Sequence, residues 1–246
     1  MARRKPRKHL SPHEAYKTLY RRYGPQGWWP VTPRGSLAPR YISSRYAERA
    51  DREAFEICAG AILTQNTSWK NAERAIVNLN GARLLSCAKI ANLSRTKLAG
   101  LIRPSGYYNQ KAGRLKAFAL YIVKHYGGRT ARMFSQRLGP LRVELLGLDG
   151  IGPETADSII LYAAGKPSFV VDAYTLRLGK RLGWFSENTS YDEAREYLSE
   201  ALPRSLKLYN EFHALIVAAG KDNCRKNPSC VGCPLKKGCE HVRKKR

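Results

Sequence analysis

The chain has 246 residues and a formal net charge of +25, from 44 basic and 19 acidic side chains. A surface with this excess of cations binds polyanions, so nucleic acid is the first candidate partner and an anionic membrane surface is the second. Hydrophobic residues make up 43% of the chain, which argues against a disordered protein, and the apolar runs are too short to span a bilayer. We therefore expect a globular protein without a membrane span.

The N-terminal fifty residues begin with a basic stretch and continue as an irregular segment. No apolar region follows the basic residues at 3–8, so the start is not a secretory signal, and we expect an intracellular protein of the cytoplasm or nucleoid. Residues 24–40 hold four prolines and three glycines, which favours a loop. Trp28 and Trp29 lie in this segment, and core packing is the ordinary role of such a pair.

Helical patterning begins at Asp51. From there apolar residues recur at steps of three and four, and glycine or proline separates the segments. Only Phe169–Val171 looks like a strand, and it is too short to carry a sheet. The predicted fold class is all-α, with about nine or ten helices. Beyond the segment that starts at Asp51, the predicted helices cover residues 68–80, 110–126, 140–147, 153–164, 173–182, 190–201 and 205–220.

A hairpin is predicted between two of these helices, at Leu148–Ala156. Gly150 and Gly152 flank a single apolar residue, which permits a tight turn and close approach of another backbone. Pro153 suits the first turn of the following helix, where no amide donor is needed. The exposed amides of such a turn can bind a phosphate, although an ordinary helical corner has the same pattern. The high positive charge favours the phosphate-binding interpretation.

Four cysteines lie close together near the C-terminus. Cys224, Cys230, Cys233 and Cys239 have the spacing Cys-x5-Cys-x2-Cys-x5-Cys. In an intracellular chain such a cluster is more typical of a metal centre than of disulfides. The spacing alone fits both a structural zinc ion and a [4Fe–4S] cluster.

Together these motifs resemble the endonuclease III-like DNA glycosylases. The hairpin resembles their helix-hairpin-helix, and Val170–Thr175, Ile62–Asn66 and Gly106–Ala112 resemble further family segments in order and spacing. The resemblance covers about residues 50–240. It implies a monomeric enzyme that acts on double-stranded DNA containing a damaged base. It also favours the [4Fe–4S] cluster over zinc, although the first cysteine gap is one residue shorter than is usual in the family.

The resemblance implies roles for individual residues. Asp172 would be the catalytic carboxylate that stabilises positive charge on the deoxyribose, although an aspartate there also suits a helix N-cap. Gln65 would fill the gap that the flipped base leaves in the duplex, and Asn66 and Tyr107 would lie beside it. The alternative for Gln65 and Asn66 is that they only cap the preceding helix. The DNA phosphates would be bound by Gly150, Gly152, Thr155 and Lys111.

Glu154 bears on the reaction class. Bifunctional members of the family carry a lysine at this position, which attacks the sugar and forms a Schiff base. A carboxylate cannot do so, and the resemblance therefore implies a monofunctional glycosylase that uses water and leaves an abasic site. Lys166 is the nearest alternative amine in the sequence, and a first-turn glutamate is in any case favoured by the helix dipole.

One branch of the family is particularly similar. Trp28-Trp29-Pro30, with residues 63–69 and 150–157, resembles the 3-methyladenine DNA glycosylases. Alkylated purines carry a positive charge that the face of an indole ring attracts, so Trp28, Trp29 and Glu154 are candidates for the base pocket. The alternatives are a bifunctional endonuclease III-type lyase for oxidised pyrimidines, a mismatch thymine or uracil glycosylase, a non-catalytic DNA-binding module and a zinc-dependent regulator.

The expected organisation is two helical subdomains. One covers residues 51–164 and ends in the helix-hairpin-helix. The other combines residues 1–50 with 165–246 and carries the cluster loop at 224–239. We expect DNA to lie across the cleft between them.

Overall fold

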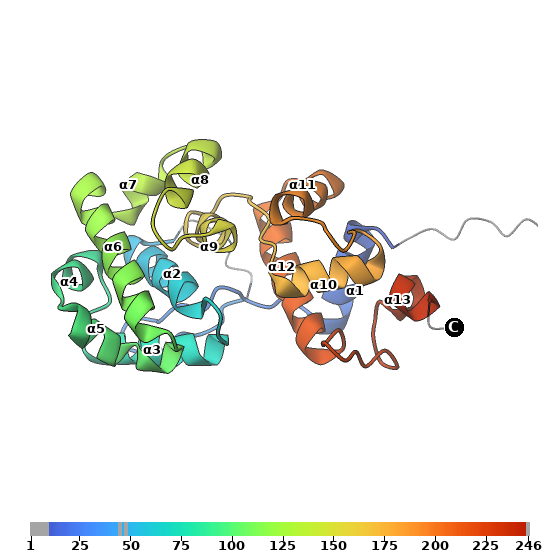
Figure 1. Cartoon of the computed structure of the whole chain (residues 1–246), viewed down its shortest axis with the longest axis horizontal. Coiled ribbons are helices and arrows are strands. Elements are labelled where there is room, and N and C mark those ends of the chain that lie inside the picture. The colour runs from blue at the N-terminus through green and yellow to red at the C-terminus, as the bar shows by residue number, and fades with distance from the viewer. Residues whose placement is uncertain (1–9, 44–45, 47–48, 245–246) are drawn as a thin grey trace, which may run out of the picture. The chain divides into compact units, whose positions relative to one another are not determined.

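The computed structural model describes residues 10–43, 46 and 49–244, and the chain is all-α in these ranges (Figure 1). The basic stretch at 3–8 lies outside them. Within the described residues, the only strand-like pairing is one isolated bridge between Val31 and Arg40, and no helix is long and apolar enough to cross a membrane. The chain divides into two compact units, Gly27–Ser168 and Met1–Gln26 with Phe169–Arg246.

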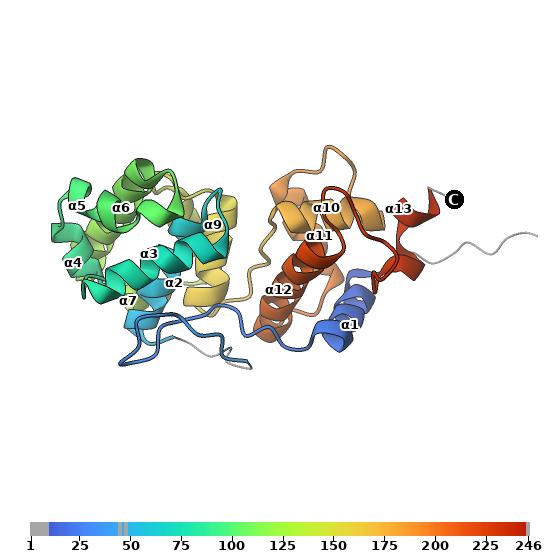
Figure 2. The same cartoon turned by 90° about the horizontal axis from the view of Figure 1, so that it is seen from below.

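The larger unit is built around α2 (Asp51–Thr64), and the residues of this helix from Ala54 to Leu63 are all buried. Figure 2 shows α2 among the other helices of this unit. A helix that is apolar on nearly all faces must be covered by neighbours, and here α3, α6, α7 and η2 pack against it. The other helices of this unit are α3 (Trp69–Gly81), α4 (Cys87–Asn92), α5 (Arg95–Leu101), η1 (Arg103–Ser105), α6 (Tyr108–Tyr126), α7 (Thr130–Phe134), α8 (Leu138–Leu146), α9 (Pro153–Ser158) and the π-helical turn η2 (Ile159–Ala163).

The smaller unit joins the two ends of the chain. Its α1 packs against α12, with the rings of Tyr16 and Phe212 5.7 Å apart, and the Gln26 amide donates to the buried Glu211 carboxylate at 2.8 Å. These contacts explain why an N-terminal helix folds with C-terminal ones (Figure 1). The helices of this unit are α1 (Pro12–Tyr23), α10 (Ala173–Leu182), α11 (Tyr191–Ala201), α12 (Leu206–Asp222), η3 (Lys236–Gly238) and α13 (Glu240–Arg243).

The structure has more helices than the sequence pattern predicted. The described residues form thirteen α-helices, against the nine or ten expected. The additional ones include α1 and the short helices α4, α5 and α7. Phe169–Val171 is buried but forms no strand.

The unit boundaries also differ from those expected, because residues 27–50 fold with the larger unit. Trp29 packs between Trp69 and Tyr162, with ring centroids 5.3 Å apart in both pairs. The amide and hydroxyl of Thr32 donate to the buried Glu56 carboxylate on α2, at 2.8 and 2.6 Å. The irregular segment thus supplies two hydrogen bonds to one oxygen of the buried Glu56 side chain. The larger unit accordingly begins at residue 27 rather than 51 and ends at 168 rather than 164.

Candidate active site

The hairpin between α8 and α9 has two glycines with different structural roles. Gly150 has a φ of 75°, and a Cβ at this position would collide with the Arg114 side chain, so the protein itself requires glycine there. Ile151 between them is buried and anchors the turn. Gly152 has an ordinary φ of −84°, and a Cβ there would meet no atom within 4 Å. The backbone at Gly152 is therefore open to a ligand, and packing within the chain does not explain its glycine.

Gln65 connects the end of α2 to this hairpin. Its Nε2 donates to the carbonyl of Gly150 at 2.8 Å and to the hydroxyl of Thr155 at 3.0 Å. Its Oε1 accepts a hydrogen bond of 2.7 Å from Arg114 on α6. Three of the residues predicted separately, Gln65, Gly150 and Thr155, are thus brought into direct contact. In this structure Gln65 is bound to the hairpin and does not extend from its loop.

The two loops predicted to enter DNA share an unusual backbone conformation. Asn66 and Tyr107 have φ values of 52° and 46°, which is uncommon outside glycine, and both side chains are exposed, Tyr107 to 67%. Such strain is often found at functional sites. Exposure and backbone conformation are consistent with side chains that contact a ligand.

Lys111 does not have the surface position expected of a phosphate-binding lysine. It is 1% exposed, and its Nζ donates to the carbonyls of Leu63 at 2.8 Å and Ser105 at 2.7 Å. Burial, with the nearby Arg114, lowers the pKa of its ammonium to about 8. Lys111 thus ties the end of α2 to η1, immediately before the loops that carry Asn66 and Tyr107. Its expected role in phosphate binding is replaced by a structural one.

An open hollow of basic character lies next to the Tyr107 loop. Arg95 and Arg103 line it together with Tyr108 and Asn109, and the lining contains no acidic residue. Arg103 lies over the Tyr108 ring at 6.0 Å, and Arg95 donates to the carbonyl of Asn109 at 3.1 Å. These two arginines place positive charge next to the Tyr107 loop, a feature that the sequence pattern did not predict.

The tryptophan pair occupies two different environments. Trp29 is 5% exposed and belongs to the core of the larger unit, where Trp69 and Tyr162 surround it. Trp28 is half-buried, and its ring contacts that of the exposed Tyr41 at 5.5 Å. The Trp28 ring also contacts those of Trp29 and Trp69, at 5.4 Å in both pairs, and of the two tryptophans Trp28 is the more exposed.

Asp172 begins α10 in the smaller unit and is its N-cap. Its Oδ1 accepts hydrogen bonds from the amide and the hydroxyl of Thr175, at 2.7 and 2.9 Å, and its Oδ2 lies 3.6 Å from Nε2 of His213 on α12. Burial raises the pKa of this carboxyl, but His213 and Thr175 outweigh burial and hold the pKa below its usual value. The result is a nearly buried carboxylate that stays ionised.

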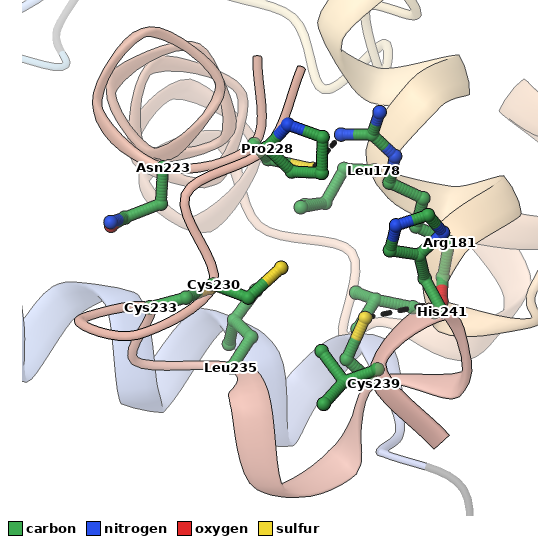
Figure 3. A pocket seen from close by; sticks show the side chains of 12 residues that line it. Leu178, Arg181, Asn223, Pro228, Cys230, Cys233, Leu235, Cys239 and His241 are labelled. Carbon is green, nitrogen blue, oxygen red and sulfur yellow. Dashed lines mark hydrogen bonds between the residues drawn. The ribbon is translucent and has the colours of Figure 1, made fainter. Parts of the chain in front are cut away.

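The four clustered cysteines line one small pocket of the smaller unit (Figure 3). Arg181 donates to the Sγ of Cys224 at 3.2 Å, and the Cys239 thiol donates to the carbonyl of Arg181 at 3.3 Å. Within the described residues, no group of three or more potential ligands is placed to hold a single metal ion. Four thiols around one pocket nevertheless fit the ligand set of a [4Fe–4S] cluster, and also that of a tetrahedral zinc ion.

Comparison with known proteins identifies the family. Residues 59–204 match the HhH-GPD superfamily of base excision DNA repair proteins. The chain belongs to this superfamily. It is 46% identical over 229 residues to a protein of Methanocaldococcus jannaschii with a provisional assignment as a DNA repair glycosylase, covering 92% of this chain and 94% of that one. Endonuclease III of Thermotoga maritima is 31% identical over 210 residues, covering 85% and 93%. The protein is therefore a DNA base excision repair glycosylase.

Solved structures agree with this assignment. A 3-methyladenine DNA glycosylase of H. pylori bound to 1,N6-ethenoadenine superposes with a TM-score of 0.69 at 31% identity, over 87% of this chain and 98% of that one. An endonuclease III in a non-covalent complex with DNA superposes with a TM-score of 0.71 at 20% identity, over 95% of each chain, and shows the same fold. The predicted all-α helix-hairpin-helix fold and the predicted glycosylase family are confirmed.

Two residues that contact candidate site residues, one in each unit, were not predicted from the sequence. Arg114 holds Gln65, but nothing distinguishes it from other basic residues on a helix. His213 left a weak signal, because it lies in the otherwise apolar run from Phe212 to Ala219. Glu154 is exposed in the first turn of α9, where the sequence placed it.

Proposed function

We propose that this glycosylase is monofunctional and removes alkylated purines such as 3-methyladenine from duplex DNA, leaving an abasic site. The observation that carries the proposal is Glu154 in the first turn of α9, at the hairpin position where lyase members of the family carry an amine. The hairpin from Leu148 to Thr155 contains no lysine, and its charged residues are Asp149 and Glu154. Without an amine, the sugar is attacked by water.

The chemistry assigned to Asp172 follows from its charge. When the bond between C1′ and the base nitrogen breaks, both electrons leave with the base, and positive charge develops on the sugar. A carboxylate that is ionised and fixed in place stabilises this charge. Water then adds to C1′ and releases its proton to solvent. A cationic alkylpurine departs as a neutral base, so no strong acid is needed to assist the leaving group.

The base itself would be recognised by stacking. The electron-rich face of Trp28 attracts a cationic purine more strongly than a neutral one. The similarity to a 3-methyladenine glycosylase supports this substrate class. Because Trp29 is a core residue, we assign the base contact to Trp28, with Glu154 as a further candidate.

The remaining DNA contacts are assigned to the hairpin and to two exposed loop residues of the larger unit. The open backbone at Gly152, with Gly150 and Thr155, would bind a phosphate of the damaged strand. Asn66 and Tyr107 would fill the gap that the flipped nucleotide leaves. We further propose that the protein acts on DNA as a monomer.

We assign the cysteine pocket to a [4Fe–4S] cluster, with a structural zinc ion as the alternative. Cys224, Cys230, Cys233 and Cys239 would hold it. Such a cluster would cross-link the loop at 230–239 to Cys224, which follows α12, and Arg181 on α10 contacts two of the four cysteines. The centre would thereby stabilise the unit that carries Asp172.

The test is a panel of duplexes that each contain one lesion, scored for base release and for strand breaks with and without alkali. We expect release of 3-methyladenine with breaks only after alkali, and no release by Asp172→Asn, which should still bind the duplex. Strand breaks without alkali on oxidised pyrimidines, or a strong covalent adduct trapped by borohydride, would refute the monofunctional assignment.

A further inference from the structure

The buried face of α12 carries polar groups in an otherwise apolar helix. Asn210, Glu211 and His213 are all buried there. Glu211 has a structural function, because its carboxylate accepts the Gln26 amide and so attaches the N-terminal segment. His213 has a different position, with its Nε2 3.6 Å from Oδ2 of Asp172. A buried imidazole beside a buried carboxylate calls for a functional explanation.

We propose that His213 is a positioning residue, which holds the Asp172 carboxylate as an anion in one orientation for base release. The inference rests on the proposed catalytic role of Asp172. Thr175 fixes only one carboxylate oxygen, Oδ1, through its amide and hydroxyl. His213 engages the other oxygen, Oδ2, from a different helix. Contacts at both oxygens prevent rotation of the carboxylate, so the same face is presented in every catalytic cycle.

The contact with His213 matters because burial disfavours the anionic form of Asp172. Taking a carboxylate out of water favours its neutral form, and a neutral Asp172 cannot stabilise a cationic sugar. The two donors from Thr175 offset part of this cost, and the contact with His213 offsets more. Without His213, burial still disfavours the anionic form of Asp172, and one of the contacts that stabilise this form is lost. The pKa of Asp172 should then rise, and activity should fall first on the acid side.

The surrounding titratable groups do not substitute for His213. On α10, Arg177 donates to the carbonyl of Cys224 and lies over the Tyr174 ring. On α11, the Tyr191 hydroxyl accepts from the amide of Val171, and on α12 Glu211 is bound to Gln26. From α1, the ring of Tyr16 packs against Phe212. In the part of the chain that the structure describes, His213 is the basic side chain that lies within 4 Å of the Asp172 carboxylate.

The experiment measures the ionisation of Asp172 directly. The chain has six aspartates, so ¹³C labelling of their carboxyl groups gives few resonances. The resonance that is missing in Asp172→Asn is that of Asp172. In His213→Ala and His213→Gln we expect this resonance to titrate at a higher pH than in the wild type. Single-turnover release of 3-methyladenine should fall by about tenfold or more on the acid side and less at higher pH. Duplex affinity should stay within about twofold, because His213 is not assigned a DNA contact.

A matched control separates this effect from loss of packing. Leu215→Ala, on the same helix and fully buried, should lower thermal stability without moving the Asp172 titration. The inference is overturned if the His213 variants titrate Asp172 as the wild type does, or if Leu215→Ala gives the same displaced profile. An active Asp172→Asn would instead refute the proposed role of Asp172, so the two failures are distinguishable.

Discussion

Alanine substitutions at the two hairpin glycines should differ in their effect on stability. At Gly150 alanine must adopt a φ of 75°, which costs about 1–2 kcal/mol. Its Cβ also displaces Arg114, which then loses its hydrogen bond to Gln65, worth about 1.5–3 kcal/mol for a charged donor. The free energy of unfolding should fall by roughly 2.5–5 kcal/mol, and the Tm by about 5–20 °C. At Gly152 neither cost arises, because φ is ordinary and the space is open.

Gly152→Ala should weaken DNA binding although it leaves the stability of the protein unchanged. A methyl group at Gly152 occupies the space that we assign to a phosphate, and loss of a charged hydrogen bond there weakens binding by roughly tenfold to a hundredfold. Circular dichroism melting gives the Tm of each variant, and fluorescence anisotropy with an uncleaved duplex gives its affinity at fixed salt. The reasoning is refuted if Gly152→Ala binds DNA like the wild type, or melts as low as Gly150→Ala.

Three further substitutions test other parts of the structure. Lys111→Met leaves two buried carbonyls without their donor and should cost roughly 3 kcal/mol or more in a urea titration. Because the pKa of Lys111 is lowered to about 8 in the folded protein, the unfolded chain keeps this proton to higher pH, and the wild type becomes more stable as the pH rises above 8. The difference in unfolding free energy between the wild type and Lys111→Met should therefore grow above pH 8. A difference that stays constant with pH would contradict this. Arg103→Ala should lower the slope of log affinity against log salt by about 1, with base release at saturating enzyme unchanged; an unchanged slope would place the basic hollow away from DNA. Cys230→Ser should abolish the broad visible absorption of a [4Fe–4S] protein, whereas a protein that is already colourless would indicate zinc.

The sequence predicted the long helices well, because their boundaries are encoded locally. The segment 173–182 was predicted from apolar spacing between Asp172 and Gly183, and α10 has those limits, with Asp172 as its N-cap. Predicting α1 required different information. Its start is marked by a capping box between Ser11 and Glu14 with Pro12 at the first position, a signal that the adjacent basic stretch obscured.

Burial at single positions was much harder to predict. A lysine in a helix beside a loop is usually a surface residue, and nothing local distinguishes Lys111 from such a residue. Its burial follows from carbonyls at Leu63 and Ser105, which only the tertiary structure brings together. The same holds for residues 27–50, whose place in the larger unit depends on the buried carboxylate of Glu56 on α2.

The tertiary contacts also change which side chain is best suited to fill the gap in DNA. If Gln65 were to enter the duplex, it would have to give up three hydrogen bonds, to Gly150, Thr155 and Arg114. At about 1 kcal/mol for each neutral bond and 1.5–3 for the charged one, the cost is roughly 4 kcal/mol. Asn66 is exposed and already in the left-handed conformation, so it can reach the duplex without that cost. Under the proposed DNA contacts, Gln65 would keep the hairpin in place while Asn66 would contact DNA, which would give each of the two adjacent amides its own role at this turn.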